Sequence, residues 1–220
     1  KMGIPIVDHL TGYVALSGIL LALQARHHSG LGQRVEATLY DTAMSLLLPH
    51  ASNYFTSRQS PQLLGSAHPN IAPYDKFRAR DGDLFLGIVN DAQFRRFCGA
   101  LGLDDLPDEA RYCSNSQRVK NRADLKQTIE LAIAQRDTGP LCEALMRAGV
   151  PAGAVNPLPT ALAHPHCEHR GLLVRQGSYV GLRSPMRLTG TPGQPGRSPP
   201  TFAQDTREVL AELGYSPDEV

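Results

Sequence analysis

The feature that most constrains the fold is a long apolar stretch close to the first residue. Residues 3–30 read GIPIVDHLTGYVALSGILLALQARHHSG. Apolar side chains recur there at the spacing of a helix face. Small residues lie among them, namely Gly12, Ala15, Gly18 and Ala22. The pattern predicts a helix over residues 9–28, ended by Gly30 and Gly32, that packs closely against another segment because small side chains let backbones approach.

One acidic residue, Asp8, stands where the short apolar run GIPIV meets this helix. A carboxylate directly before a helix is typical of an N-cap, which accepts hydrogen bonds from the free amides of the first turn and contributes about 1 kcal/mol. The same position suits a nucleophile, because the positive end of the helix favours a carboxylate and its amides can bind a developing oxyanion. The local pattern leaves both roles open.

The rest of the chain predicts a change from helices to a mixed unit. Alternation and helical spacing indicate a strand over 33–39, a helix over 40–55 kinked at Pro49, a loop over 56–73, strand-like runs at 72–79 and 83–89, and helices over 91–101, 121–149 and 204–214. Asp-Gly between the two strand-like runs indicates a hairpin. The helical stretch 121–149 is expected to break near Gly139-Pro140. A strand-like VPAGAV, a short helix and a loop-rich stretch follow from Val150.

Composition excludes several classes of partner. The chain is 41% hydrophobic and 20% charged, which is enough apolar material for a real core, and a net charge of +1 with scattered basic residues argues against a nucleic acid or a membrane surface. No apolar stretch is expected to reach the length of a membrane span. The cysteines have no paired spacing, which favours reduced thiols and a cytoplasmic location. Because the sequence opens at Lys1 inside structured sequence, we expect a segment of a longer chain.

Other candidate groups have plainer interpretations. The run from His164 to His169 offers several metal ligands, but neighbours this close and interrupted by proline seldom converge on one ion, so no metal site is expected. Cys98 is expected in the core, because it shares a helix face with phenylalanines. Arg118 and Arg122 lie one turn apart; they either bind an anion or, as the more ordinary alternative, form a solvated helix face.

A resemblance adds to these patterns. The stretch from Gly3 to Leu47 resembles the signature of the family III CoA-transferases (the CaiB/BaiF family), in which an aspartate leads a helix that ends in R-x-x-(S/T)-G-x-G-Q-x-V. Here those positions are Arg26, Ser29, Gly30, Gly32, Gln33 and Val35. The similarity continues through GSAHPNIAPYDKFRARDGDLFLGIVNDAQF, SNSQRVKNRADL, GVPAGAVN, HPHCEHRG and the pattern after Pro199. It covers essentially the whole chain and is greatest to members that use short dicarboxylates.

The resemblance implies a role for Asp8 as the family's nucleophile. Its carboxylate would attack an acyl-CoA thioester to give a mixed anhydride and then an aspartyl-CoA thioester, from which CoA passes to a carboxylic acid. Gly65, His68 and Asn70 match the family's closing loop and are expected to contact substrate, although His68 and Asn70 fit an ordinary surface loop equally well. Leu39 matches a position near the acyl group, and it also fits a buried strand.

The resemblance also implies an architecture. The expected fold is α/β: residues 1–65 carry the nucleophile in large-domain or linker helices, residues 66–155 form a small α+β domain, and residues 156–220 return to the large Rossmann-like domain. Coenzyme A and acyl-CoA are expected as substrates, with no metal, in an interlocked homodimer. The family's CoA-contacting residues lie mostly upstream of the aspartate, so residues 1–220 alone are expected to be inactive.

Two alternatives remain open. The 2-methylacyl-CoA racemases share the fold and the aspartate, but they use it as an acid or base with an upstream histidine. Their motif is more glycine-rich directly after the aspartate than the sequence around His9 and Leu10, which favours transfer. The second alternative is an inactive truncated fragment. The identities of the acyl donor and acceptor do not follow from the sequence.

Overall fold

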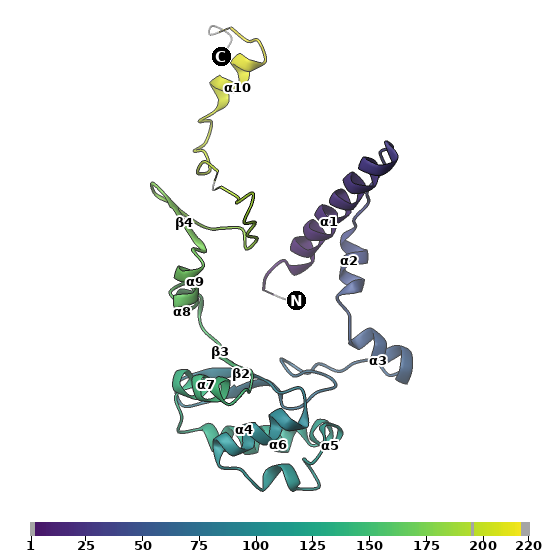
Figure 1. Cartoon of the computed structure of the whole chain (residues 1–220), viewed down its shortest axis with the longest axis vertical. Coiled ribbons are helices and arrows are strands. Elements are labelled where there is room, and N and C mark those ends of the chain that lie inside the picture. Colours follow the sequence, from purple (N-terminus) through teal and green to yellow (C-terminus); the bar gives the residue numbers. More distant parts are fainter. Residues whose placement is uncertain (1–2, 195, 217–220) are drawn as a thin grey trace. The chain divides into compact units, whose positions relative to one another are not determined.

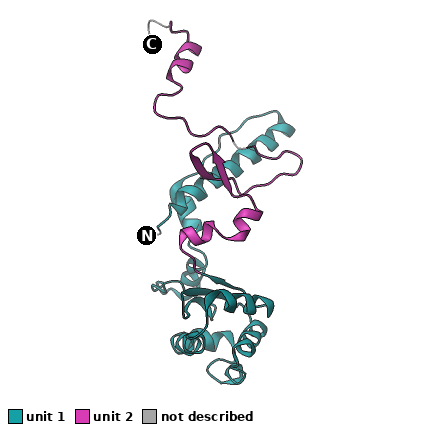
Figure 2. Ribbon diagram, turned by 90° about the vertical axis from the view of Figure 1, so that its left-hand side faces the viewer, with its two compact units in different colours: residues 1–154 teal, residues 155–220 magenta. Residues whose placement is uncertain are grey.

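The structure, a computed structural model, describes residues 3–194 and 196–216. The chain divides into two compact units, Lys1–Ala154 and Val155–Val220 (Figure 2). Unit 1 begins with helices and continues into a small sheet covered by further helices (Figure 1).

The first unit opens with a long helix, α1, over Ile6–Ser29. Two short helices follow, α2 over Leu39–Ser45 and α3 over His50–Ser57. The predicted interruption near Pro49 is confirmed, because residues 46–49 form turns between α2 and α3. A proline has no N–H for the helix ladder, so the second helix starts after it.

The end of α1 explains the glycines that follow it. Gly30 adopts the left-handed conformation (φ 73°) and its N–H donates to the carbonyl oxygen of Arg26 at 2.8 Å, which ends the helix as predicted. The chain then returns along α1, and a Cβ at Gly18 would lie 2.8 Å from Cγ1 of Val35. Gly18 is therefore required for this close approach.

The predicted strand over residues 33–39 is wrong. Residues 31–38 have no regular secondary structure, and Leu39 already belongs to α2. Alternating side chains give a segment the local preference of a strand, but a strand also needs a hydrogen-bonded neighbour. None of the residues described by the structure pairs with this segment.

The predicted hairpin is confirmed. Strands β1 (Tyr74–Arg78) and β2 (Asp83–Gly87) pair antiparallel, and β3 (Ala152–Ala154) adds to β2. Phe77 lies opposite Leu84, and both side chains are buried. The turn between the strands closes with a hydrogen bond from the Ala79 N–H to the Gly82 carbonyl oxygen at 2.9 Å.

Helices pack on this sheet and supply most of its core. They are α4 (Asp91–Leu101), the short 3-10 helix η1 (Leu106–Asp108), α5 (Asn115–Lys120), α6 (Arg122–Ile133) and α7 (Thr138–Arg147). α6 contacts β1, and α7 contacts β2 and β3. Cys98 is fully buried, as predicted, and burial raises the pKa of its thiol to about 12.

The break in the long helical stretch lies earlier than predicted. α6 ends at Ile133 and α7 begins at Thr138, so Gly139 and Pro140 lie inside the first turn of α7. The first N–H groups of a helix have no partner within it, so a proline there loses no hydrogen bond. The proline therefore marks a helix start.

Unit 2 contains helices α8 (Leu158–Leu162), α9 (Pro165–His169) and α10 (Thr206–Glu212). Strands β4 (Leu173–Gln176) and β5 (Tyr179–Leu182) form an antiparallel hairpin where the sequence analysis expected only loops. Gly177, with φ 59°, occupies the turn between them. A Gly-Ser pair between short apolar runs is the signal that would have predicted it.

Helix α1 is long and apolar enough to meet the criteria for a membrane span. α1 has 24 residues, and the mean hydropathy of its most apolar window, 1.6, reaches the range of membrane spans because its polar residues are mostly uncharged. The expectation that no stretch reaches this length is therefore wrong. Length and composition alone do not assign α1 to a membrane, since the core helix of a larger soluble fold meets the same two criteria.

Candidate active site

Asp8 lies in the first turn of α1 and is exposed. The predicted N-cap role is wrong, because the helix begins two residues before Asp8 and Pro5 occupies the N-cap position without a side-chain hydrogen bond. The Ile6 N–H donates to the Ile4 carbonyl oxygen at 2.9 Å, so the preceding turn satisfies one of the free amides. The carboxylate still lies at the positive end of the helix.

The surface around Asp8 is open. A depression of about 400 Å³ is lined by Asp8, His9, Gly12, Tyr13 and Leu16. Among residues 3–194 and 196–216, no hydrogen bond or ion pair joins the Asp8 carboxylate to another group. A Cβ at Gly12 would meet no atom within 4 Å. The carboxylate is therefore accessible to a reactant that approaches along this side of α1.

Leu39 is the first residue of α2 and is 52% exposed. The interpretation of Leu39 as a buried strand residue is therefore wrong. The Thr38 side chain caps α2 by accepting a hydrogen bond from the Asp41 N–H at 3.1 Å. A contact of Leu39 with an acyl group stays a prediction.

The loop between α3 and β1 contains the other three predicted site residues. Gly65 has φ 63°, a conformation that favours glycine. The His68 ring lies against Tyr74, with 5.2 Å between ring centroids, and its Nδ1 accepts a hydrogen bond from the Asn70 N–H at 3.1 Å. These contacts give the loop a defined shape around His68.

Electrostatics at His68 favour the neutral ring. Burial lowers the pKa of His68, and the positive charges of Arg122 and His50 lower it further. Because Nδ1 accepts from Asn70, the single ring proton of the neutral form lies on Nε2. His68 can therefore donate a hydrogen bond to a carboxylate or carbonyl oxygen.

The Asn70 side chain already has a partner. Asn53 of α3 donates to Asn70 Oδ1 at 2.8 Å, and Asn70 Nδ2 donates back to Asn53 Oδ1 at 3.0 Å. Gly65, His68 and Asn70 thus share one loop, whereas Asp8 and Leu39 lie on α1 and α2, which contact each other. No hydrogen bond or ion pair within the described residues joins these two sets.

Two arginines have roles that the sequence analysis missed. Arg118 is 1% exposed and donates to the carbonyl oxygens of Ala72 (2.8 Å) and Tyr112 (3.0 Å) and to Asp91 Oδ1 (2.6 Å). Arg122 donates to two carbonyl oxygens of the site loop. The interpretation of both as a solvated helix face is therefore wrong.

A signal for this arrangement exists in the sequence. Asn115, Arg118 and Arg122 follow one another at intervals of three and four, the spacing of one helix face, although the structure divides them between α5 and α6. Helical spacing indicates which donors share a face, but it does not choose the groups that they bind.

Residues 3–194 and 196–216 include histidines, cysteines and acidic residues that could ligate a metal. No group of three or more His, Cys, Asp or Glu side chains is placed to share an ion in this part of the chain. His164 is the N-cap of α9, and its Nδ1 accepts from the His166 N–H at 3.1 Å.

Comparisons with known proteins agree on one family. The sequence profile of CoA-transferase family III matches residues 1–206. A succinate–glutarate CoA-transferase from Agrobacterium fabrum is 35% identical over 218 residues, which are 97% of this chain and 54% of that protein. A succinyl-CoA:glutarate CoA-transferase from Mus musculus is 28% identical and covers 97% of this chain and 50% of its own length.

A solved structure has the same fold. The crystal structure of a CAIB/BAIF family protein from Brucella suis superposes with a TM-score of 0.78 and is 33% identical, covering 97% of this chain and 56% of that one. The fold is therefore the mixed α/β fold of these proteins. The chain spans about half the length of the curated relatives that it matches.

Proposed function

The chain belongs to CoA-transferase family III, and from this premise we propose that the full-length protein moves CoA from an acyl-CoA donor to a carboxylic acid through Asp8. One observation supports this most: the family match includes the apolar helix whose first turn presents Asp8 as an exposed carboxylate. A short dicarboxylate is the proposed acceptor, because similar relatives are named for succinate and glutarate.

The proposed reaction has four balanced steps. A carboxylate oxygen of Asp8 attacks the thioester carbonyl, the carbon–sulfur bond breaks, and CoA thiolate leaves a mixed anhydride. The thiolate then attacks the Asp8 carbonyl, which releases the donor acid and gives an aspartyl-CoA thioester. The acceptor carboxylate attacks the carbonyl carbon of this thioester, the carbon–sulfur bond breaks, and CoA thiolate leaves a second mixed anhydride. The thiolate then attacks the acceptor acyl carbon, and the bond between that carbon and the Asp8 oxygen breaks. Asp8 is regenerated, and no water is consumed.

This sequence of steps sets two requirements. Water must be kept from both anhydrides, because hydrolysis would destroy the transferable group. A dicarboxylate substrate also has a second carboxylate that takes no part in the reaction, and this group needs a hydrogen-bond donor. In the proposal the closing loop meets both requirements, and His68, with its proton on Nε2, is the donor.

The assembly is also part of the proposal. None of the residues of α1 is buried, and the exposed ones include the large apolar side chains of Ile19, Leu20 and Leu21. Such a surface needs a cover, and an interlocked homodimer of the full-length protein would provide one. A cytoplasmic location is proposed as well, supported by four free cysteine thiols.

The experiment is covalent capture on the full-length protein. The protein is mixed with succinyl-CoA and treated either with hydroxylamine or with borohydride. The peptide that contains Asp8 is then analysed by mass spectrometry. A hydroxamate or a reduced side chain at Asp8 is expected, since both reagents react with an aspartyl thioester. Asp8→Ala should abolish the adduct and CoA exchange.

A matched control is Asp41→Ala, which removes an exposed acidic residue from the first turn of the neighbouring helix α2. It should retain the adduct. Deuterium uptake at the α-carbon of a 2-methylacyl-CoA without an adduct would instead indicate a racemase. Undiminished CoA exchange by Asp8→Ala would contradict the proposal.

A further inference from the structure

The loop that carries His68 is held by a side chain from a different part of unit 1. Arg122, the first residue of α6, donates from Nη1 to the His68 carbonyl oxygen at 3.1 Å and from Nη2 to the Pro69 carbonyl oxygen at 2.9 Å. Its Nε donates to the Val119 carbonyl oxygen at 3.2 Å. This third bond fixes the plane of the guanidinium group, so both loop carbonyls are held at once.

Asn115 of α5 holds the next part of the same loop. Its Nδ2 donates to the Asn70 carbonyl oxygen at 2.8 Å, and its Oδ1 accepts from the Ala72 N–H at 3.2 Å. Together with the Arg122 contacts, side chains from α5 and α6 therefore bind backbone groups of residues 68, 69, 70 and 72.

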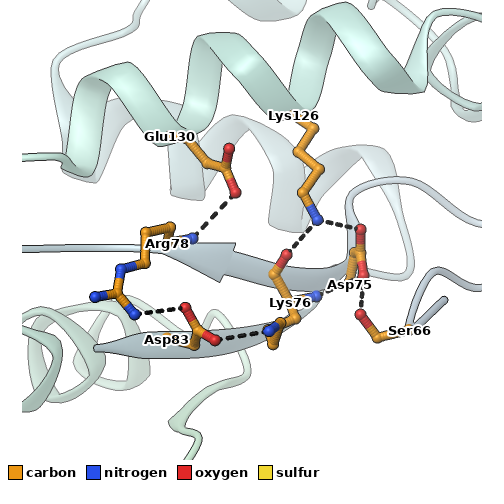
Figure 3. Close-up of polar contacts among 7 residues, drawn as sticks. All are labelled: Ser66, Asp75, Lys76, Arg78, Asp83, Lys126 and Glu130. Carbon is orange, nitrogen blue, oxygen red and sulfur yellow. Dashed lines mark hydrogen bonds and ion pairs between the residues drawn. The ribbon is translucent and has the colours of Figure 1, made fainter.

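The loop lies over a pocket instead of a packed surface. A cavity of about 290 Å³ is lined by Leu64, Ala67 and Ile71 of the loop, by Tyr74 and Phe77 of β1, and by Lys126 of α6, among others. Beside it, Ser66 donates to Asp75, which also accepts from Lys126 Nζ at 2.7 Å (Figure 3). None of residues 64–71 is buried, so polar contacts supply much of what holds this part of the loop.

The shape of the loop decides which ring atom His68 can offer. The Asn70 N–H reaches His68 Nδ1 only while residues 68–70 keep their turn, and Arg122 binds the two carbonyl groups inside that turn. Nε2 has no hydrogen bond to a residue that the structure describes. The charged and titratable groups near the ring are Arg122, His50 and Tyr74, whose own ring packs against His68.

We propose that Arg122 is a positioning residue for substrate binding, which holds residues 68–70 so that the His68 ring directs its Nε2–H to the substrate carboxylate. The inference rests on the proposed function for the identity of the ligand. The claim that Arg122 holds residues 68–70 rests on its hydrogen bonds to the loop and does not depend on the ligand. Arg122 does not touch the reacting atoms; it acts through the loop.

The test compares three variants of the full-length protein. Arg122→Lys keeps the charge but cannot bind two carbonyl groups in a fixed plane, and Arg122→Gln removes the charge as well. Arg95→Gln is the matched control, because Arg95 lies on α4 of the same unit in an exposed ion pair with Asp108. Backbone amide exchange, histidine Cε1 hydrogen exchange, thermal stability and the kinetics of CoA transfer from succinyl-CoA to glutarate are measured for each.

Both Arg122 variants are expected to speed amide exchange in a peptide that covers residues 66–72, with little change elsewhere. Arg122→Gln should also raise the pKa of His68, since it removes one of the causes that lower it. The KM for the acceptor should rise about tenfold in Arg122→Lys, as expected for the loss of one or two hydrogen bonds. Labelling of Asp8 by the acyl-CoA donor should persist in the same variant. Arg95→Gln should match the wild type in all four measurements.

The outcomes separate two failures. Unchanged amide exchange and an unchanged KM in both Arg122 variants would overturn the inference. A lower thermal stability with an unchanged KM would also overturn it, because that pattern belongs to a merely structural residue. If the wild type transfers no CoA, the proposed function fails, and exchange at residues 66–72 together with the His68 pKa still decides whether Arg122 positions the loop.

Discussion

Helix α1 and the later part of unit 1, residues 72–154, bury their apolar side chains very differently. α1 is strongly apolar, yet none of its residues is buried and Leu21 is 71% exposed. The buried cluster comes instead from residues between Phe77 and Val150. That later part also contains the buried Arg118, whose guanidinium group has three hydrogen-bond acceptors.

The difference shows that the two regions obtain their stability from different sources. Residues 72–154 have a core of their own, built from β1, β2 and the helices α4, α6 and α7. α1 has the length and the small residues for close packing, but its apolar side chains lack buried contacts within the described residues. Within the described residues, its apolar side chains therefore contribute little of the burial that stabilises a helix in a folded protein.

The largest expected effect comes from separating the regions. Residues 60–156 expressed alone should fold cooperatively, because the whole buried cluster lies within them. Residues 1–59 alone should show no cooperative unfolding and should associate through exposed apolar side chains. Thermal melts and sedimentation check both. A cooperative, monomeric 1–59 would remove the contrast.

A large effect is expected at Arg118. Arg118→Met leaves the carbonyl groups of Ala72 and Tyr112 without their donor and should lower the free energy of unfolding by about 3 kcal/mol. The matched variant Arg95→Met breaks an exposed, solvent-screened ion pair and should cost much less than Arg118→Met. Urea unfolding measures both changes. Equal losses in the two variants would mean that burial does not distinguish these arginines.

An intermediate effect is expected where the chain returns along α1. Gly18→Val places a branched side chain against Val35 and should lower the free energy of unfolding of the full-length protein by about 2 kcal/mol. Val35→Ala in the same chain should restore part of that loss, which a double-mutant cycle measures. A harmless Gly18→Val would show that residues 30–38 do not pack on α1.

The smallest effect concerns acid stability at Asp75. Burial alone would raise the pKa of Asp75, but hydrogen bonds from Lys126, Ser66 and the Lys76 N–H outweigh it and the net pKa is lowered from 3.8. The stabilisation is therefore present above pH 3.8 and is lost as the pH falls through the lower value of the folded state.

Lys126→Met removes the first of these hydrogen bonds, so its acid unfolding midpoint should move slightly to higher pH. Lys120→Met, an exposed change at the end of α5, should leave the midpoint in place. Acid titrations followed by circular dichroism compare the variants. Identical midpoints would mean that the Asp75 contacts contribute nothing in solution.

Local patterns predicted several elements correctly. The hairpin at Arg80-Asp81-Gly82, the end of α1 at Gly30 and the buried position of Cys98 follow from turn chemistry, helix capping and helical spacing. The errors have a common origin. The strand expected at 33–39 lacks a neighbour, and the break expected at Pro140 is a helix start whose Thr138 N–H donates to the distant Asp81 Oδ1 at 2.8 Å, so nonlocal partners decided both outcomes.

The candidate site divides in the same way. The family signature indicated Asp8 and the loop with Gly65, His68 and Asn70, and their catalytic or binding roles stay predictions. The contacts that hold this loop were not predicted, because each joins residues about fifty positions apart or comes from an arginine that resembled a surface residue.

The sequence by itself determined the family, the long apolar helix and the hairpin of the small sheet, because each depends on residues that are neighbours in the chain. Only the tertiary structure decided that Arg118 is buried, that Arg122 binds the His68 loop, and that the loop lies over a cavity. The physical reason is that a long polar side chain has the same local preference in solvent or against a buried carbonyl group. Its partner is chosen only when distant segments come together.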